Sequence, residues 1–140
     1  MALVNREHIT EYIPQRDPIC LVHTIYECNS EEIKTGFFIE SNHLLVSENK
    51  LMEAGITENM AQSAAAHAGF LARQNNEAPK VGFIGNIKDL KIVQLPVVGS
   101  EVITQIKIKA HVMNVTLIEA SSNCNGQPVA SCEMKIFLQE

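Results

Sequence analysis

Residues 54–74 read AGITENMAQSAAAHAGFLARQ, and this stretch decides the fold. Its apolar residues recur at intervals of three and four, which predicts one long amphipathic helix. They are Ile56, Met60, Ala61, Ala64, Ala65, Ala68 and Leu71. At about 100° per residue, one side of this helix gathers within about 60° the residues Glu58, Ala61, Gln62, Ala65 and Gly69. Because most of these side chains are small, other backbone segments can approach that side closely.

Strand signals dominate the sequence on both sides of this helix. A short amphipathic helix over residues 6–12 is followed by strands over residues 19–26 and 33–39, and then by an irregular stretch over residues 40–52. Four more strands follow, over residues 81–92, 101–113, 115–123 and 129–138, with a tight turn at Asn125-Gly126. In the second of these, Val102, Thr104, Ile106 and Ile108 alternate with residues of the opposite face, such as Lys107 and Lys109. An antiparallel sheet wrapped around one small-faced helix is the hot-dog fold, of the α+β class.

Length and charge narrow the class of protein further. A chain of 140 residues forms one domain, here residues 1–140, and can bury a core without a disulfide scaffold or a metal. The formal net charge of -5 argues against nonspecific nucleic-acid binding, which needs a basic stripe. The amino terminus lacks the pattern of a signal peptide, and no apolar run reaches the roughly 20 residues that span a bilayer. We therefore expect a cytoplasmic protein with no membrane partner.

Glu58 is the first candidate for chemistry. It lies near the start of the predicted helix, on the small-residue side and one turn before Gln62. An exposed acid in the first turn could simply complement the helix dipole. However, its neighbours on that side are Ala and Gly. Burying an unpaired carboxylate in such apolar surroundings costs a free energy on the order of several kcal/mol. The pattern therefore favours a functional carboxyl group.

His43 is the natural partner of Glu58, because it lies in the irregular stretch just before the helix. A histidine and a carboxylic acid that meet in an apolar tunnel can remove a proton α to a thioester and protonate a leaving hydroxyl. The alternative interpretation of His43 is an exposed loop residue, and the residues alone do not decide between the two. His67 lies about 180° round the helix from Glu58, and no histidine forms a metal-binding pattern, so no metal is expected.

Three stretches of the chain resemble the FabZ-type 3-hydroxyacyl-ACP dehydratases. The first is Glu58-Asn59-Met60-Ala61-Gln62 with the alanine-rich turn after it, which is similar to the family's E-x-M-A-Q signature and most similar to dehydratase-like proteins of aryl-polyene and flexirubin-type pathways. The second is Tyr12-Ile13-Pro14-Gln15-Arg16-Asp17-Pro18-Ile19, which resembles the family's opening Pro-His-Arg-x-Pro-Met segment. The third is Leu95-Pro96-Val97-Val98-Gly99-Ser100-Glu101-Val102, which resembles its Pro-Val-x-x-Gly-Asp strand entry. Together they span most of the chain.

The resemblance implies a dimer whose active site takes its histidine and its acid from opposite subunits. Carried over, the acid is Glu58, the histidine is His43, and Gln62 binds substrate. The chain departs from the family where Ser41-Asn42-His43-Leu44-Leu45-Val46 replaces His-Phe-Pro and Met52-Glu53 replaces Pro-Gly.

The implied activity is dehydration of a 3-hydroxyacyl thioester, carried on acyl carrier protein or coenzyme A, in fatty-acid or polyene-type biosynthesis. No dissociable cofactor is required, because the substrate is itself carried on a phosphopantetheine thioester. The implied assembly is a homodimer or a dimer of dimers, or a hetero-oligomer with a related hot-dog subunit. Two alternatives stay open: an acyl thioesterase in which Glu58 activates water, and a non-catalytic acyl-binding subunit.

Overall fold

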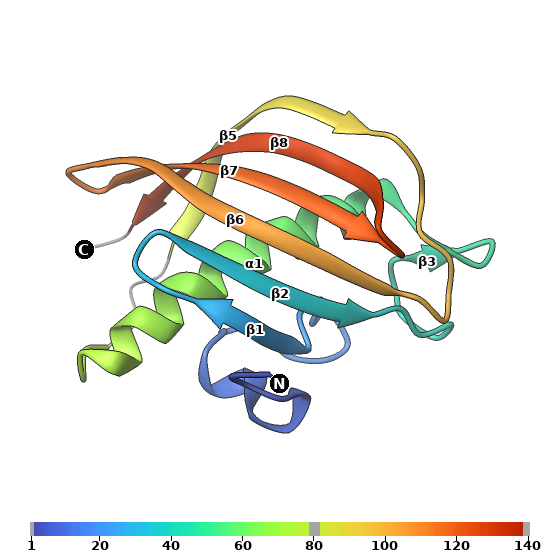
Figure 1. The fold of residues 1–140 in the computed structure, drawn as a ribbon, viewed down its shortest axis with the longest axis horizontal. Helices are drawn as coiled ribbons and strands as arrows, with labels where there is room; N and C mark the ends of the chain where they lie inside the picture. The colour runs from blue at the N-terminus through green and yellow to red at the C-terminus, as the bar shows by residue number, and fades with distance from the viewer. Residues whose placement is uncertain (1, 79–81, 139–140) are drawn as a thin grey trace.

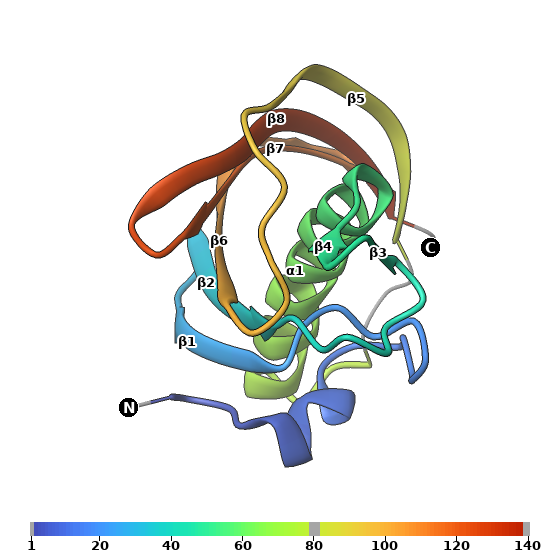
Figure 2. The same ribbon diagram turned by 90° about the vertical axis from the view of Figure 1, so that its right-hand side faces the viewer.

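The computed structural model describes residues 2–78 and 82–138, which form one curved sheet around one long helix. In chain order the elements are η1 (Arg6–Glu11), β1 (Thr24–Cys28), β2 (Glu32–Phe38), β3 (Val46–Ser47), β4 (Lys50–Leu51), α1 (Glu53–Gln74), β5 (Gly82–Ile92), β6 (Glu101–Val112), β7 (Val115–Cys124) and β8 (Gln127–Leu138). The six longer strands form an antiparallel sheet in the order β1-β2-β6-β7-β8-β5. The helix α1 lies across its concave face (Figure 1), and seen from the side the sheet curls around the helix (Figure 2). The predicted hot-dog fold is confirmed.

The alternation predicted for the strand that begins at residue 101 is present in β6. Val102, Thr104 and Ile106 are buried against α1, whereas Lys107 and Lys109 are exposed. The same register continues across the sheet, because Thr104 pairs with Thr35 of β2 on one side and with Ser122 of β7 on the other. The concave face of the sheet therefore carries a short row of hydroxyl groups within an otherwise apolar surface.

The helix is joined to this row by a buried polar network. Thr104 donates its hydroxyl hydrogen to Asn59 Oδ1 at 2.6 Å, and its own oxygen lies 2.8 Å from the Ser122 hydroxyl. One turn further along α1, the Ser63 hydroxyl donates to the Asn59 carbonyl and lies 2.8 Å from the Thr35 hydroxyl. All five side chains are fully or almost fully buried. A buried polar group costs free energy unless it is paired, and these groups are paired only at one position of α1 along the sheet. The network therefore fixes that position.

The strand predicted over residues 19–26 is wrong in its first half, since β1 begins only at Thr24. Residues 19–21 are held by side chains of the helix in place of a neighbouring strand. Gln62 accepts a hydrogen bond from the Leu21 N–H at 2.6 Å and donates to the Ile19 carbonyl at 2.8 Å, while Asn59 donates to the Leu21 carbonyl at 2.7 Å. Leu21 is fully buried, as a strand residue would be, so the apolar pattern alone could not separate the two arrangements.

Other boundaries differ by smaller amounts. The first helix is a 3-10 helix, and residues 40–52, predicted to be irregular, contain the short β3-β4 pair. The long helix begins at Glu53, one residue before the predicted start, and β8 begins at Gln127. Val81, the predicted first residue of the strand after the helix, lies outside the described residues.

The small-residue side of α1 does admit close backbone, as its composition predicts. A Cβ atom added to Gly69 would collide with the backbone carbonyl of Tyr12, at the end of η1. Glycine at this position therefore lets the amino-terminal segment lie directly on the helix. Tyr12 and Gly69 both line the cavity described next.

Candidate functional site

A cavity of about 530 Å³ runs along the small-residue side of α1. Its walls are the face of α1 from Glu58 to Gly69, the segment of residues 10–16, the start of β5 and the end of β8. The helical wall is about 16 Å long, at about 1.5 Å of rise per residue. Apart from Glu58, that wall consists of alanine and glycine, whereas the segment of residues 10–16 also brings polar side chains to the cavity. An apolar wall with a few polar groups, in a cavity of this volume, is typical of a small-molecule site.

Glu58 and Gln62 are brought together, one turn apart on the helix. Glu58 is half-buried and lines the cavity, and its Oε1 accepts a hydrogen bond of 3.2 Å from Gln62 Nε2. Gln62 is fully buried, and its amide also holds the Ile19 carbonyl and the Leu21 N–H. Gln62 thus orients the Glu58 carboxyl group and fixes it relative to residues 19–21. The contact of Gln62 with substrate, expected from the sequence, stays a prediction.

A second cavity, of about 360 Å³, adjoins the first between α1 and the sheet. The two share the lining residues Ala64, Ala68, Ile136 and Leu138. His67 lines this second cavity, is almost fully buried, and hydrogen-bonds the Asn29 carbonyl through Nε2 at 2.8 Å. His67 therefore lies away from Glu58, as the helical projection predicts.

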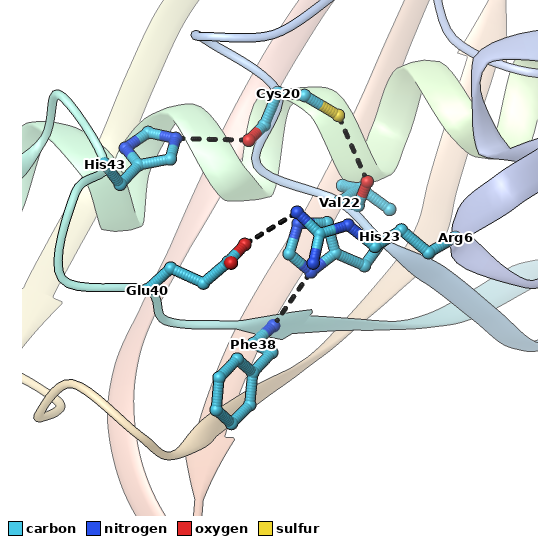
Figure 3. A network of polar contacts seen from close by, with 7 residues as sticks. All are labelled: Arg6, Cys20, Val22, His23, Phe38, Glu40 and His43. Atoms are coloured by element: carbon cyan, nitrogen blue, oxygen red, sulfur yellow. Dashed lines mark hydrogen bonds and ion pairs between the residues drawn. The ribbon is translucent and has the colours of Figure 1, made fainter.

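His43 is held by the backbone of its own chain (Figure 3). Its Nδ1 accepts a hydrogen bond from the Leu45 N–H at 3.1 Å, and its Nε2 lies 3.1 Å from the Cys20 carbonyl. Because a carbonyl can only accept and Nδ1 accepts from the Leu45 N–H, the ring proton lies on Nε2. The ring also packs edge-on against Phe37, with centroids 5.5 Å apart. The loop of His43 is thus ordered by contacts within the chain.

Within one chain, residues 19–21 separate the two candidate catalytic side chains. Gln62 binds the Ile19 carbonyl and the Leu21 N–H, while His43 binds the carbonyl of the residue between them, Cys20. The Ile19 and Leu21 carbonyl groups are bound by side chains of α1, whereas the Cys20 carbonyl between them is bound by His43, so His43 approaches this segment from another side than the helix does. Across residues 2–78 and 82–138, no hydrogen bond or ion pair joins His43 to Glu58.

The region around His43 contains a second buried imidazole, that of His23. Its Nδ1 accepts a hydrogen bond of 3.2 Å from the Phe38 N–H, and an ion pair of 2.6 Å between Arg6 and Glu40 lies beside it (Figure 3). Burial, and then the positive charge of Arg6, lower the pKa of His23 to about 4. His23 is therefore neutral at physiological pH.

We expect His23 to make the protein less stable in weak acid. Between about pH 6.5 and about pH 4 the unfolded chain binds a proton at this residue and the folded chain does not, so the free energy of unfolding falls as the pH falls through this window. The contribution is about 3 kcal/mol at most. Urea unfolding across the window should give a flatter profile for His23→Gln than for wild type, because a glutamine can still accept from the Phe38 N–H. Parallel profiles for the two proteins would contradict this assignment.

Two residues of this region were not singled out from the sequence. Asn59 hydrogen-bonds the Leu21 carbonyl and the Thr104 hydroxyl group. The only feature of the sequence that could have identified Asn59 is its place inside the motif from Glu58 to Gln62. Gln15 lines the same cavity as Glu58, and its Oε1 is buried without a hydrogen-bond partner. In the segment that resembles Pro-His-Arg, Gln15 occupies the position of the histidine. This replacement was the feature of the sequence that could have pointed to Gln15.

No group of three or more His, Cys, Asp or Glu side chains within residues 2–78 and 82–138 is arranged to hold a metal ion. No helix in the part of the chain that the structure describes is long and apolar enough to cross a membrane.

Comparison with known families gives one match over nearly the whole chain. The model of the ApeP-like family, whose description is ApeP dehydratase, matches residues 7–140 of this chain. A search of curated protein sequences gives no significant match.

Solved structures show the same fold at low sequence identity. The dehydratase heterocomplex ApeI:P from Xenorhabdus doucetiae superposes with a TM-score of 0.87 at 14% identity, over 94% of this chain and 91% of that chain. An HP0420 homologue from Helicobacter felis superposes with a TM-score of 0.72 at 11% identity, over 100% of this chain and 93% of that chain. A hypothetical thioesterase protein with coenzyme A, from Streptococcus pneumoniae TIGR4, superposes with a TM-score of 0.67 at 8% identity. The superposition covers 82% of this chain and 84% of that chain.

Proposed function

Because the chain belongs to the ApeP-like dehydratase family, we propose that it dehydrates a 3-hydroxyacyl thioester, bound to a carrier protein, to the trans-2-enoyl thioester. The observation that carries this proposal is the position of Glu58, whose carboxyl group is the one polar side-chain group on the otherwise apolar helical wall of the cavity. An acyl chain fits such a wall, and its reacting carbons then lie beside a proton donor.

The reaction needs one acid and one base. In its protonated form, Glu58 gives a proton to the 3-hydroxyl group, which leaves as water with the electron pair of the carbon–oxygen bond. The base takes the α-proton, and the electrons of that carbon–hydrogen bond form the new double bond. The bond from Gln62 holds the Glu58 carboxyl group in one orientation while this happens.

His43 of a second subunit is the base in this proposal. Within one chain, residues 19–21 stand between His43 and Gln62, the residue that holds Glu58. A site that takes His43 from one subunit and Glu58 from the other therefore accounts for this arrangement better than a site within one chain. To accept the α-proton at Nε2, the ring has to release the Cys20 carbonyl and carry its own proton on Nδ1 instead. Nδ1 then no longer accepts the hydrogen bond from the Leu45 N–H. The substrate α-carbon then takes the place of that carbonyl.

The second subunit is proposed to pair along β5, which forms one edge of the sheet. An exposed edge with apolar side chains is a surface that proteins cover, and Phe83 and Leu90 on β5 are 59% and 42% exposed. The start of β5 also lines the Glu58 cavity, so a chain on this edge would lie next to the site. The similar ApeI:P structure is a heterocomplex, which makes a related hot-dog subunit a candidate partner as well as a second copy.

We expect the purified chain to be a dimer or a dimer of dimers. Sedimentation equilibrium at micromolar concentration measures this directly. Leu90→Glu, which places a charge on the β5 edge, should shift the equilibrium toward monomer, whereas Met113→Glu should not, because Met113 is 90% exposed in the turn between β6 and β7. A monomer at micromolar concentration would exclude a homodimer.

An assay with two substrates tests the proposed function. A 3-hydroxyacyl thioester and the matching plain acyl thioester are offered side by side, and enoyl absorbance and free thiol are both recorded. Enoyl product from the first substrate supports dehydration. Thiol release without enoyl product supports a thioesterase, an alternative favoured by the similar fold of the thioesterase protein from Streptococcus pneumoniae TIGR4. The non-catalytic acyl-binding subunit would give neither signal.

A further inference from the structure

One buried polar atom in the Glu58 cavity has no partner. Gln15 Oε1 is the only buried side-chain nitrogen or oxygen in residues 2–78 and 82–138 without a hydrogen bond. Folded proteins pair the great majority of such atoms, and an exception calls for a ligand, a water molecule or a functional reason. Gln15 and Glu58 line the same cavity, so a turn of the Gln15 side chain would bring this buried oxygen to a ligand bound there.

The segment that carries Gln15 is held in place by its neighbours. Arg16 donates through Nη1 to the carbonyl groups of Ile13 at 2.7 Å and of Gln15 itself at 2.9 Å. The Tyr12 carbonyl at the other end of the segment lies against Gly69 of the helix. The Gln15 side chain is therefore presented from backbone that is fixed against α1, as a binding group needs to be.

The proposed reaction supplies a group that this oxygen fits. When Glu58 donates a proton to the substrate 3-hydroxyl oxygen, the hydrogen of that hydroxyl group still needs an acceptor. Apart from Glu58, the alanine and glycine side chains of the helical wall offer none, so the acceptor has to come from the segment of residues 10–16 on the other side of the cavity. We propose that Gln15 Oε1 accepts the hydrogen bond of the substrate 3-hydroxyl group, which makes Gln15 the residue that recognises hydroxylated acyl chains. This inference rests on the proposed function.

The same contact accounts for the leaving group. As the carbon–oxygen bond breaks, the oxygen gains the proton from Glu58 and keeps its own hydrogen, which stays bonded to Gln15. The product is a water molecule that donates one hydrogen bond to Gln15 and one to the Glu58 carboxylate. No other reactant is needed.

Binding of two ligands tests the assignment without turnover. In a Glu58→Gln background, affinities are measured for a 3-hydroxyacyl pantetheine thioester and for the acyl thioester of the same length that lacks the hydroxyl group. Gln15→Met, which keeps the length of the side chain and removes its acceptor, should weaken the first ligand about tenfold, the scale of one hydrogen bond, and the second less than twofold. Gln15→His should keep the difference between the ligands, since imidazole also offers an acceptor.

Gln74→Met is the matched control, because Gln74 is exposed at the end of α1 and lines neither cavity. Equal weakening of both ligands by Gln15→Met, or of neither, would overturn the role of Gln15. The two proposals fail separately. If wild type yields no enoyl product but the hydroxyl-selective loss is present, dehydration is wrong and Gln15 still recognises the hydroxyl group.

Discussion

Glu58→Gln should lower the rate of enoyl formation at least about a hundredfold, the typical contribution of a general acid, while the melting temperature stays the same or rises. The substitution keeps the volume of the side chain and an oxygen that can accept the hydrogen bond from Gln62. It removes the proton that the leaving hydroxyl group needs. It also removes a half-buried carboxyl group from an apolar wall, which is why stability is not expected to fall.

Glu53→Gln is the control for this experiment. Glu53 is exposed in the first turn of the same helix and lines neither cavity, so its loss tests the general effect of removing a negative charge from the start of α1. Enoyl absorbance and thermal unfolding are measured for both variants. If Glu58→Gln unfolds the protein, then Glu58 is structural, and the proposed reaction loses its acid.

His43→Ala should also lower kcat at least about a hundredfold, with little change in substrate affinity. The substitution removes the proposed base. It also leaves the Cys20 carbonyl and the Leu45 N–H without their partner, so we expect a loss of about 1–2 kcal/mol in the free energy of unfolding. Rates are therefore compared well below the melting temperature of the variant. Leu44→Ala is the control, because Leu44 is 64% exposed in the same loop.

Mixing the two inactive variants separates catalysis from loop structure. If each site combines His43 of one subunit with Glu58 of the other, a mixed dimer of the two variants contains one intact site, and about a quarter of the wild-type activity returns after subunit exchange. Lack of recovery after demonstrated exchange would show that the two residues do not share a site across the interface. Activity of His43→Ala within a few-fold of wild type would leave His43 as a residue that orders its loop.

The overall fold and the family were predictable from the sequence, because both depend on local patterns. The spacing of apolar residues over 54–74 predicts α1 to within one residue, and the alternation in residues 101–109 predicts the buried face of β6. The resemblance carried by Glu58–Gln62 led to the dehydratases of the hot-dog superfamily, which the match over residues 7–140 confirms. Helix geometry alone places Glu58, Ala61, Ala65 and Gly69 on one side, where they line one cavity.

Only the tertiary structure decided which polar groups meet. The amide of Gln62 bonds Leu21 and Ile19, which lie 41 and 43 positions earlier in the chain, and no local pattern encodes such a pairing. The segment at residues 19–21 looks like a strand in sequence, because burial imposes the same apolar residues whether its partner is a strand or a helix side chain. The unpartnered oxygen of Gln15 exists only because distant segments close around it. Periodicity fixes which face of an element is buried, whereas hydrogen-bond partners depend on packing between segments far apart in the chain.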